Sequence, residues 1–325
     1  MSAPRIVVTG KIPEPGVEVL KTIGEVWAWT DDEPIPHDIR DEQLATADAV
    51  VTLLTDTVDE AFLDAAPQLK IIANVAVGYN NIDVGLCQVR GVTVTNTPGV
   101  LTEDTADVAM ALMLAVPRRI AEGDKVTRTG EWTGWAPTGM LGHRINGKRL
   151  GIIGMGRIGC AVARRARGFG LSIHYHNRKP VHPETEAELE ATYWESLDQM
   201  LSRVDIVSVN CPHTPATQKL LTRERLEMMQ PSAYLVNTSR GEVVDEDALA
   251  DLLASRHIAG AGLDVYADEP NITKALLDLP NVVLLPHIGS ATIEGRLEMG
   301  DKVIINIQTF WDGHAPRDRV IEAML

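Results

Sequence analysis

The feature that most constrains this chain is a glycine-rich turn between a predicted strand and a predicted helix. In the segment RLGIIGMGRIG, Gly154, Gly156 and Gly159 follow the G-x-G-x-x-G spacing. Here the first glycine permits a tight turn, the second lets a pyrophosphate approach the backbone, and the third lets the helix pack closely on the strand. Because a helix N-terminus also offers free N–H groups to phosphate, the motif predicts a dinucleotide-binding strand–helix unit.

The rest of the chain repeats the same alternation of short apolar runs and amphipathic stretches. The apolar runs of the second half are LGIIG, LSIHYH, DIVSVN, AYLVN, IAGAGLDV and VVLLP. Those of the first half are RIVVTG, EVWAW, AVVTLL, KIIANV and VTVTN, separated by the helical patterns PEPGVEVLKTI, HDIRDEQLATA, TVDEAFLDAAP and IDVGLCQVRG. Runs that are continuously apolar indicate strands buried on both faces, hence parallel sheets covered by helices.

This pattern, in a chain of 325 residues, predicts two α/β domains, each a doubly wound parallel sheet. The last segment, 291–311, reads as a helix that returns to the first domain. We therefore expect a discontinuous, flavodoxin-like substrate-binding domain of residues 1–100 and 292–325, and a Rossmann dinucleotide-binding domain of residues 101–291. The helical stretch 101–128 between them should bend or split at Pro117. It suits an interdomain spine or a dimerisation arm, followed by an extended loop at 130–148.

Composition narrows the partners and the compartment. Forty-five acidic against 30 basic side chains give a net charge of −15, which disfavours nucleic acid and anionic membranes as partners. The three cysteines are widely spaced and form no Cys-x-x-Cys pair, so we expect reduced thiols, a cytoplasmic setting and no metal site. No signal peptide is expected, and the longest apolar run, near VAMALMLAVP, is too short to cross a bilayer.

The stretch HYHNRKP ends the second strand of the dinucleotide unit. At this position an acid usually binds the adenosine ribose hydroxyls, but here Asn177, Arg178 and Lys179 follow the strand. A carboxylate would repel a 2′-phosphate, whereas a guanidinium can pair with it. The sequence therefore predicts that NADP(H) is preferred and that NAD(H) is possible, with Asn177 bonding a ribose oxygen or a phosphate.

Three polar residues follow predicted strands of the second domain: Arg240, Glu269 and His287. In an open parallel sheet, ligands bind outside the carboxyl ends of the strands, so the three side chains should converge there. Hydride transfer to the carbonyl of a 2-oxo acid needs a proton donor, which an imidazolium beside a carboxylate can be. A guanidinium would bind the substrate carboxylate and polarise the carbonyl.

These motifs together resemble those of the D-isomer-specific 2-hydroxyacid dehydrogenases. The resemblance spans nearly the whole chain and is carried by NVAVGYNNIDV, GKRLGIIGMGRIG, LVNTSRGEVVDEDAL, GAGLDVYADEP and LLPHIGSAT. Within the family, GEWTGWAP and HNRK are most similar to glyoxylate/hydroxypyruvate reductases. The resemblance implies that His287 is the acid/base, Glu269 its partner and Arg240 the substrate anchor.

It also implies the remaining site residues. Val77 and Gly78 would offer backbone N–H groups to the substrate carboxylate, and Trp135 would reach the partner's active site in a homodimer. Apart from the resemblance, the residues Leu53, Leu54 and Thr55 are expected to border the substrate side chain, where two large leucines favour small substrates. Besides the three glycines, Asn177, Arg178, Lys179 and His287, the expected cofactor-binding residues are Thr105, Arg157, Ile158, Cys211, Pro212, Thr217, Thr238, Ser239, Asp264 and Gly289. Asp264 would lie near the nicotinamide carboxamide.

Several alternatives remain open from the sequence. Glu269 favours oxo-acid chemistry over formate oxidation, since formate dehydrogenases of this superfamily carry an amide there. Reduction of glyoxylate or hydroxypyruvate is the leading interpretation, and a larger 2-oxo acid is the second. A dinucleotide-sensing scaffold is the third, disfavoured because the long disordered tails of such proteins are missing. One departure is Asn80-Asn81, where the family often has Asn-Asp or Asp-Asn.

Overall fold

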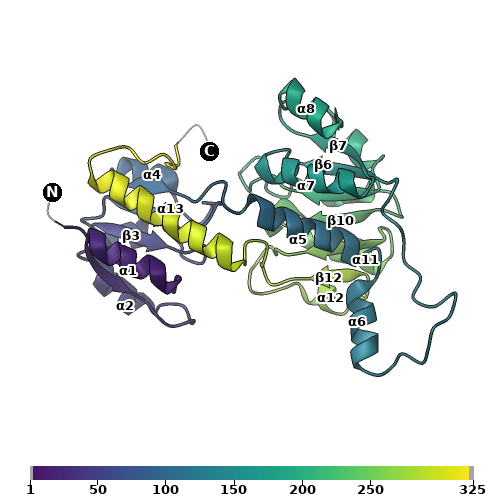
Figure 1. The fold of residues 1–325 in the computed structure, drawn as a ribbon, viewed down its shortest axis with the longest axis horizontal. Helices are drawn as coiled ribbons and strands as arrows, with labels where there is room; N and C mark the ends of the chain where they lie inside the picture. The colour runs from purple at the N-terminus through teal and green to yellow at the C-terminus, as the bar shows by residue number, and fades with distance from the viewer. Residues whose placement is uncertain (1–2, 322–325) are drawn as a thin grey trace. The chain divides into compact units, whose positions relative to one another are not determined.

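The computed structural model describes residues 3–321, and in it the chain divides into two compact units (Figure 1). Among the described residues, one unit contains 3–101 and 291–321, and the other contains Thr102–Ser290. Residues 1–2 and 322–325, which the sequence assigned to the substrate-binding domain, lie outside the described residues. No helix of the described part is both long and apolar enough to cross a membrane.

The smaller unit is a parallel sheet of five strands in the order β2-β1-β3-β4-β5, the flavodoxin-like order. Its strands are β1 (Arg5–Val8), β2 (Glu25–Ala28), β3 (Ala49–Thr52), β4 (Ile71–Asn74) and β5 (Thr93–Thr95). Its helices are α1 (Glu14–Ile23), α2 (His37–Leu44), α3 (Glu60–Ala65), α4 (Val84–Val89) and α13 (Ile293–Trp311). The C-terminal helix α13 lies beside α1 and packs on β4, so the end of the chain completes this unit (Figure 1).

The larger unit is a parallel sheet of seven strands in the order β12-β11-β10-β9-β6-β7-β8. This is the Rossmann order with one strand added at its end. The strands are β6 (Arg149–Ile153), β7 (Ser172–His176), β8 (Ala191–Tyr193), β9 (Ile206–Val209), β10 (Tyr234–Asn237), β11 (Gly260–Leu263) and β12 (Val282–Leu284). The strand β8 was not predicted. The expectation of two parallel α/β sheets is confirmed.

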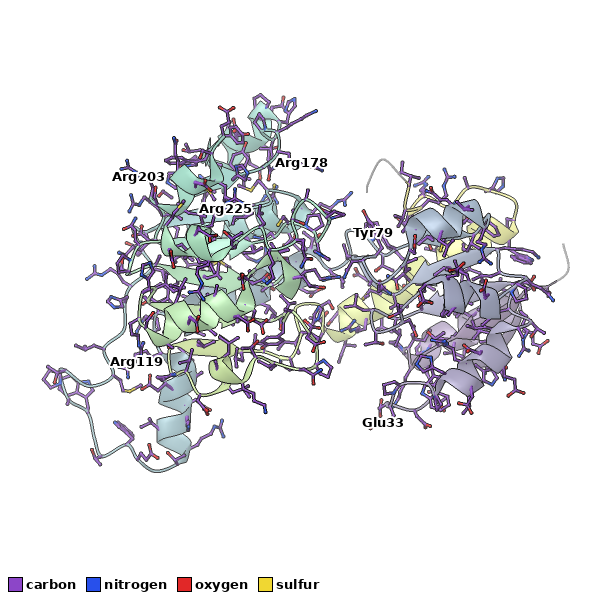
Figure 2. All side chains as sticks on the ribbon, turned by 180° about the vertical axis from the view of Figure 1, so that it is seen from behind. Glu33, Tyr79, Arg119, Arg178, Arg203 and Arg225 are labelled. Carbon is purple, nitrogen blue, oxygen red and sulfur yellow. The ribbon has the colours of Figure 1, made fainter. Side chains whose placement is uncertain are left out.

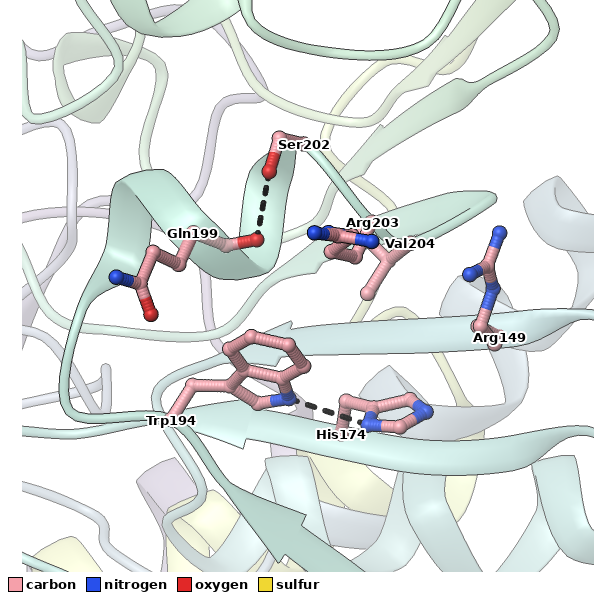
Figure 3. A pocket seen from close by; sticks show the side chains of 7 residues that line it. All are labelled: Arg149, His174, Trp194, Gln199, Ser202, Arg203 and Val204. Carbon is pink, nitrogen blue, oxygen red and sulfur yellow. Dashed lines mark hydrogen bonds between the residues drawn. The ribbon is translucent and has the colours of Figure 1, made fainter.

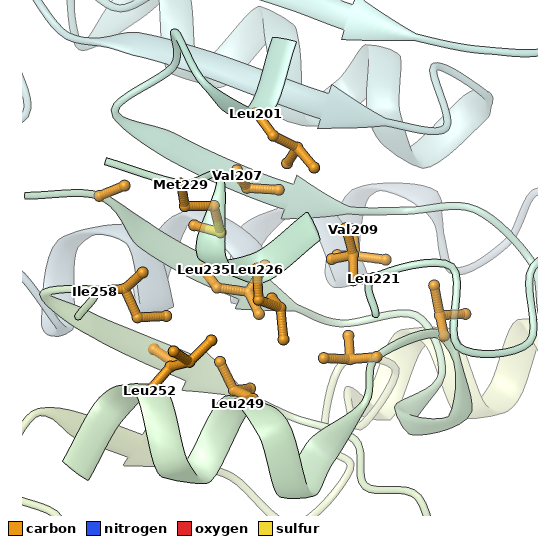
Figure 4. Packing of buried hydrophobic residues seen from close by; sticks show 14 of the residues in the cluster. Leu201, Val207, Val209, Leu221, Leu226, Met229, Leu235, Leu249, Leu252 and Ile258 are labelled. Atoms are coloured by element: carbon orange, nitrogen blue, oxygen red, sulfur yellow. The ribbon is translucent and has the colours of Figure 1, made fainter. Parts of the chain in front are cut away.

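Helices cover both faces of this larger sheet. They are α5 (Thr102–Ala115), α6 (Ile120–Arg128), α7 (Arg157–Gly168), α8 (Pro183–Leu189), α9 (Leu197–Leu201), α10 (Arg223–Glu227), the 3₁₀ turn η1 (Gly241–Val243), α11 (Glu246–Ala254) and α12 (Lys274–Leu277). One core joins α5 and α7 to the sheet, and the other joins α9, α10 and α11 to it (Figure 4). Apolar side chains on both faces explain why the strand sequences are continuously apolar.

Local sequence signals explain where several helices start and stop. Asp59, Asp83, Asp245 and Thr292 each accept a hydrogen bond from a backbone N–H in the first turn of the helix that they precede, as N-cap residues do. The stretch 101–128 is split around Pro117 into α5 and α6, because proline cannot donate to the helix ladder. The loop that follows α6 has no helix or strand, and α6 and this loop extend away from the sheet of their unit (Figure 1).

Candidate active site

The phosphate-binding turn has the geometry that its glycines predict. Gly154 has φ +95°, and a Cβ there would lie 2.5 Å from the backbone nitrogen of Cys211, so only glycine fits. A Cβ on Gly159 would lie 2.3 Å from the carbonyl oxygen of Gly154, which shows how closely α7 packs on the turn. Gly156, by contrast, faces open space. A phosphate can therefore approach the backbone at the N-terminus of α7.

Asn177 is tied to this turn. Its Oδ1 accepts a hydrogen bond from the Met155 N–H at 2.7 Å. The sequence assigned Asn177 a bond to ribose or phosphate, whereas in the structure its carbonyl oxygen braces the glycine turn and its amide nitrogen remains available. Arg178 and Lys179 are exposed and form no ion pair with any residue of the described range 3–321 (Figure 2). Arg157 is likewise exposed at the start of α7.

The other expected cofactor residues lie after the strands of the same unit. Cys211 and Pro212 follow β9, and burial raises the pKa of the Cys211 thiol to about 11, so it stays protonated at neutral pH. Thr217 Oγ1 donates to the Pro212 carbonyl at 2.7 Å, which closes that loop on itself. Thr105 lies in the first turn of α5 and comes within van der Waals distance of a Cβ built on Gly289.

Thr238 and Ser239 follow β10. Ser239 donates through both N–H and Oγ to Asn237 Oδ1 at 3.0 Å. The Thr238 hydroxyl is buried and has no hydrogen-bond partner among the described residues. A buried polar group of this kind usually has a partner, so an unpaired hydroxyl at this edge, together with the open space at Gly156, fits a bound dinucleotide.

The structure brings Glu269 and His287 into contact. Glu269 Oε2 lies 2.7 Å from His287 Nδ1, and Glu269 Oε1 accepts the Tyr266 N–H at 3.0 Å. Burial alone raises the pKa of Glu269, but the hydrogen bond and charge of His287, the Tyr266 N–H and the charge of Arg240 together lower it below its ordinary value. An ionised carboxylate only accepts hydrogen bonds, so His287 Nδ1 carries a proton and Nε2 is the atom that faces a ligand.

The backbone at His287 is strained, and Asp264 holds it. His287 has φ +54°, a left-handed conformation that costs a non-glycine residue about 1–2 kcal/mol. The Asp264 carboxylate accepts the N–H groups of Ile288 at 2.8 Å and of Gly289 at 2.7 Å. The sequence expected Asp264 near the nicotinamide carboxamide. In the structure each of its oxygens accepts an N–H group of the turn that carries His287, and these bonds hold that turn in place.

Arg240 is placed beside the dyad by its glycine neighbour. A Cβ on Gly241 would lie 1.9 Å from the carbonyl carbon of Tyr266, so only glycine lets the turn after β10 approach the loop that carries Glu269. Burial lowers the pKa of Arg240, while the charges of Glu242 and Glu269 act to raise it. Since arginine stays protonated in proteins, the site keeps a half-buried cation next to a carboxylate.

Glu246 is a further supporting residue that the sequence did not reveal. Its two oxygens accept the Ala267 N–H at 2.9 Å and the Thr273 N–H at 3.3 Å. Both bonds fix the loop between β11 and α12, which carries Glu269. The sequence signal for Glu246 is only that of an acidic residue in the first turn of a helix, since its partners are backbone groups about 21 and 27 positions away.

The expected substrate contacts lie in the other unit, after β3 and β4. Leu53 packs on the core of that unit, against Gly10, whose Cβ would lie 2.2 Å from the leucine Cδ1. Leu54 is half-buried and Thr55 is exposed. Val77 and Gly78 are half-buried, and their N–H groups donate to no acceptor within residues 3–321. Trp135 lies in the loop after α6, where it is 84% exposed, and Trp132 is 60% exposed.

One hollow lies away from these residues. It has a volume of about 510 Å³ and lies near the amino ends of β6 and β9, at one face of the larger sheet (Figure 3). Its lining includes Arg149, His174, Trp194 and Arg203. Trp194 donates its indole N–H to His174 Nδ1 at 3.1 Å. Because Arg240, Glu269 and His287 follow the carboxyl ends of their strands, the hollow takes no part in their chemistry.

A Rossmann unit with a guanidinium and a carboxylate–imidazole pair after its strands defines a nicotinamide-dinucleotide-dependent oxidoreductase. A sequence model of the D-isomer specific 2-hydroxyacid dehydrogenase NAD binding domain matches residues 110–289. Taken with the relatives described next, this match shows that the chain belongs to the D-isomer-specific 2-hydroxyacid dehydrogenases. The family resemblance inferred from the sequence is confirmed, and the scaffold alternative is not favoured.

The relatives are similar over their full length. Glyoxylate reductase of Thermococcus litoralis is 46% identical, with 99% of this chain and 98% of the relative covered. The structure of NADPH-dependent glyoxylate/hydroxypyruvate reductase from Sinorhizobium meliloti, in complex with NADP and malonate, has a TM-score of 0.87 and 38% identity over 99% of this chain and 98% of that one. A glyoxylate reductase from Paecilomyes thermophila has a TM-score of 0.89 and 33% identity, covering 99% and 100%.

Proposed function

We propose that this protein reduces glyoxylate and hydroxypyruvate to their 2-hydroxy acids. The observation that carries the proposal is the 2.7 Å contact between Glu269 Oε2 and His287 Nδ1 beside Arg240, in a unit with a dinucleotide-binding turn. Relatives that share 44–47% of their residues with this chain over nearly its whole length are glyoxylate reductases. A larger 2-oxo acid is not favoured by these relatives.

Each proposed catalytic residue has a distinct role in the reduction. When bound, the reduced nicotinamide supplies the hydride to the carbonyl carbon. His287 Nε2 gives a proton to the carbonyl oxygen, and Glu269 keeps the ring oriented and stabilises its charged form. Arg240 pairs with the substrate carboxylate and polarises the carbonyl. Asp264 and Glu246 fix the two loops that present His287 and Glu269.

The smaller unit is proposed to bind the same carboxylate through backbone N–H groups and to border the substrate side chain. The N–H groups of Val77 and Gly78 have no acceptor in the described part of the chain, and two adjacent N–H groups suit a carboxylate. Leu54 borders the substrate side chain. We also propose a homodimer, in which the loop after α6 places Trp135 at the partner's site. Trp132, Trp135 and Leu141, three large apolar residues of this loop, are exposed, which suits a surface that a partner covers.

The proposed cofactor is NADPH, with NADH as a weaker alternative. Asn177 holds the glycine turn, Arg178 pairs with the 2′-phosphate, and Lys179 adds to the local positive charge. The proposed path of the dinucleotide is lined by residues that follow the strands, with two more at its nicotinamide end: Cys211, Pro212, Thr217, Thr238 and Ser239, then Thr105 and Gly289.

A direct test of the proposed function is the loss of absorbance at 340 nm when purified protein, NADPH and glyoxylate are mixed. Absence of turnover with every short 2-oxo acid would refute the proposed function.

Reversing one charge should change the cofactor preference. In Arg178→Asp, kcat/KM with NADPH should fall roughly 10- to 100-fold, because a charge-assisted pair is replaced by repulsion, while kcat/KM with NADH should hold or rise. Steady-state kinetics with both cofactors measures the ratio. Arg203→Asp is the matched control, since Arg203 lies in the hollow before β9 (Figure 3). An unchanged ratio in Arg178→Asp would make Arg178 an ordinary surface residue.

Removing the carboxylate of the dyad should change how thermal stability depends on pH. The folded pKa of Glu269 lies below its ordinary value, so the carboxylate is ionised throughout the neutral range. The ionised carboxylate therefore adds to the free energy of unfolding above the ordinary glutamate pKa. This contribution is lost as the pH falls through the lower pKa of Glu269 in the folded protein. In Glu269→Gln this ionisable carboxylate is absent, so the loss of thermal stability on acidification should be smaller than in the wild type. Melting temperatures that change in parallel in both proteins from neutral to acidic pH would contradict the pairing.

A further inference from the structure

A buried asparagine joins the ends of two neighbouring strands in the smaller unit. Asn74 is the last residue of β4 and is fully buried. Its Oδ1 accepts the hydroxyl of Thr52, the last residue of β3, at 3.0 Å. Its Nδ2 donates to the Gly78 carbonyl at 3.0 Å and to Asn81 Oδ1 at 3.3 Å. Every polar atom of this buried amide is therefore used.

Asn81 carries the connection to the loop after β3. Its Nδ2 donates to the Leu53 carbonyl at 3.2 Å and to the Asp56 carbonyl at 2.9 Å. Asn81 is thus hydrogen-bonded at both ends of its side chain, to Asn74 on one side and to residues 53 and 56 on the other. The two loops, 53–56 and 75–81, are joined by amide side chains over sequence separations of 25 and 28 residues.

The loop after β4 is fixed through its carbonyl groups, which leaves N–H groups of the same loop available. The carbonyl of Ala76 accepts the Thr97 N–H at 2.9 Å, and that of Val77 accepts Asn96 Nδ2 at 2.7 Å. The Gly78 carbonyl accepts from Asn74. The carbonyl groups of residues 76, 77 and 78 therefore all accept hydrogen bonds from other residues of the chain. The N–H groups of Val77 and Gly78 are left without acceptors within residues 3–321, so the loop offers donors outward.

The loop after β3 is fixed by a half-buried carboxyl group, that of Asp56. Asp56 Oδ2 accepts the Leu53 N–H at 2.7 Å and the hydroxyl of Thr9. Burial raises the pKa of Asp56 despite these bonds. Leu53 is packed inward on Gly10, which leaves Leu54 and Thr55 as the residues at the outside of the loop. Asn81 supplies the donors to the carbonyl groups at both ends of this loop.

We propose that Asn81, held by Asn74, is a positioning residue that sets the loop 53–56 against the loop 75–78 and so governs discrimination among short 2-oxo acids. The inference rests on the proposed function, in which one loop binds the carboxylate and the other borders the side chain. In a 2-oxo acid the carboxylate and the side chain lie a fixed distance apart. A rigid link between the loop proposed to bind the carboxylate and the loop proposed to border the side chain therefore limits how long a side chain can be accommodated.

Two replacements of Asn81 test this proposal. Asn81→Asp keeps an acceptor for Asn74 but loses both donors, and Asn81→Ala loses the whole amide. With two hydrogen bonds removed, the KM for glyoxylate should rise about tenfold, while kcat and the KM for NADPH stay near wild type. The ratio of kcat/KM for 2-oxobutyrate to that for glyoxylate should rise at least about threefold. A factor of roughly three is the change in an equilibrium constant that the loss of one weak hydrogen bond produces.

Controls separate the possible outcomes. Asn146→Asp makes the same chemical change in the other unit, where the Asn146 amide donates to the Phe169 carbonyl, and should leave the ratio unchanged. Wild-type substrate ratios in folded Asn81 variants would overturn the inference. So would a parallel rise in both KM values with a lower Tm, which would indicate a general structural role. Failure of the wild-type protein to reduce glyoxylate would instead refute the proposed function.

A milder variant keeps the test decisive if neither Asn81 variant folds. Thr52→Val removes only the hydroxyl that fixes Asn74 Oδ1. The KM for glyoxylate should then rise roughly threefold, the effect of one weakened hydrogen bond, and the ratio should move in the same direction. An unchanged KM and ratio in a folded Thr52→Val protein would overturn the inference.

Discussion

Replacing His287 with alanine is expected to lower kcat for glyoxylate reduction by about 10²- to 10⁴-fold, the usual contribution of a positioned general acid. The KM for glyoxylate should change little, because the proton is delivered only in the transition state. The structure supports this expectation through one contact. Glu269 occupies Nδ1 at 2.7 Å, so Nε2 is the nitrogen left to serve the substrate.

The measurement is steady-state reduction of glyoxylate with NADPH, with cofactor binding followed separately by fluorescence. NADPH affinity should remain near wild type, which shows that the Rossmann unit is intact. His314→Ala is a matched control, because His314 is exposed in the other unit after α13. A kcat for His287→Ala within a few-fold of wild type, under conditions in which the chemical step limits the rate, would remove His287 from the role of acid.

Most of the fold follows from the apolar runs, and the one missing strand shows the limit of that signal. The strand β8 has three residues, Ala191–Tyr193, at the edge of the sheet, and none of them is buried. An edge strand of this kind has no continuous apolar run, because it needs no burial on both faces. Its position depends on pairing with β7, which a local pattern does not reveal.

The proximity of the proposed catalytic side chains could be predicted for a similar reason. Arg240, Glu269 and His287 are polar residues that follow apolar strands, and parallel topology gathers such positions at one edge. Their supporting bonds were not predicted. Asp264 was expected in the site and Glu246 was not, and both accept hydrogen bonds from backbone N–H groups of residues distant in the sequence. The bonds of Asn81 to the carbonyls of residues 53 and 56 are hidden for the same reason.

Asn177 illustrates a position predicted correctly with an incomplete role. The sequence placed it at the end of the second strand and assigned it to the cofactor. The structure adds a 2.7 Å bond from the Met155 N–H to its side-chain oxygen. A residue without a charge can hold this N–H and leave the neighbouring space acceptable to a phosphate. Asn177 therefore accounts for two features: it supports the glycine turn, and it adds no negative charge where an acidic residue is usual.

Replacing Arg240 with alanine is the second substitution with a large expected effect. The side chain is half-buried next to the Glu269 loop and is placed there by the contact of Gly241 with Tyr266. It is proposed to bind the substrate carboxylate and to polarise the carbonyl, so its loss should affect both binding and the chemical step. We expect kcat/KM for glyoxylate to fall by roughly 10²- to 10³-fold, the cost of removing one preorganised donor at a developing oxyanion.

The pattern of loss and rescue identifies the role of Arg240. Arg240→Lys keeps the positive charge but not the planar fork, so it should recover only part of kcat/KM. Added guanidinium ion should partly restore Arg240→Ala, since it would supply the lost charge near Glu269, where the substrate carboxylate is proposed to bind. NADPH binding and the Tm serve as the controls for folding. Full activity in Arg240→Lys would show that a point charge suffices, and an equal loss of NADPH affinity in Arg240→Ala would assign the residue to the cofactor rather than to the substrate.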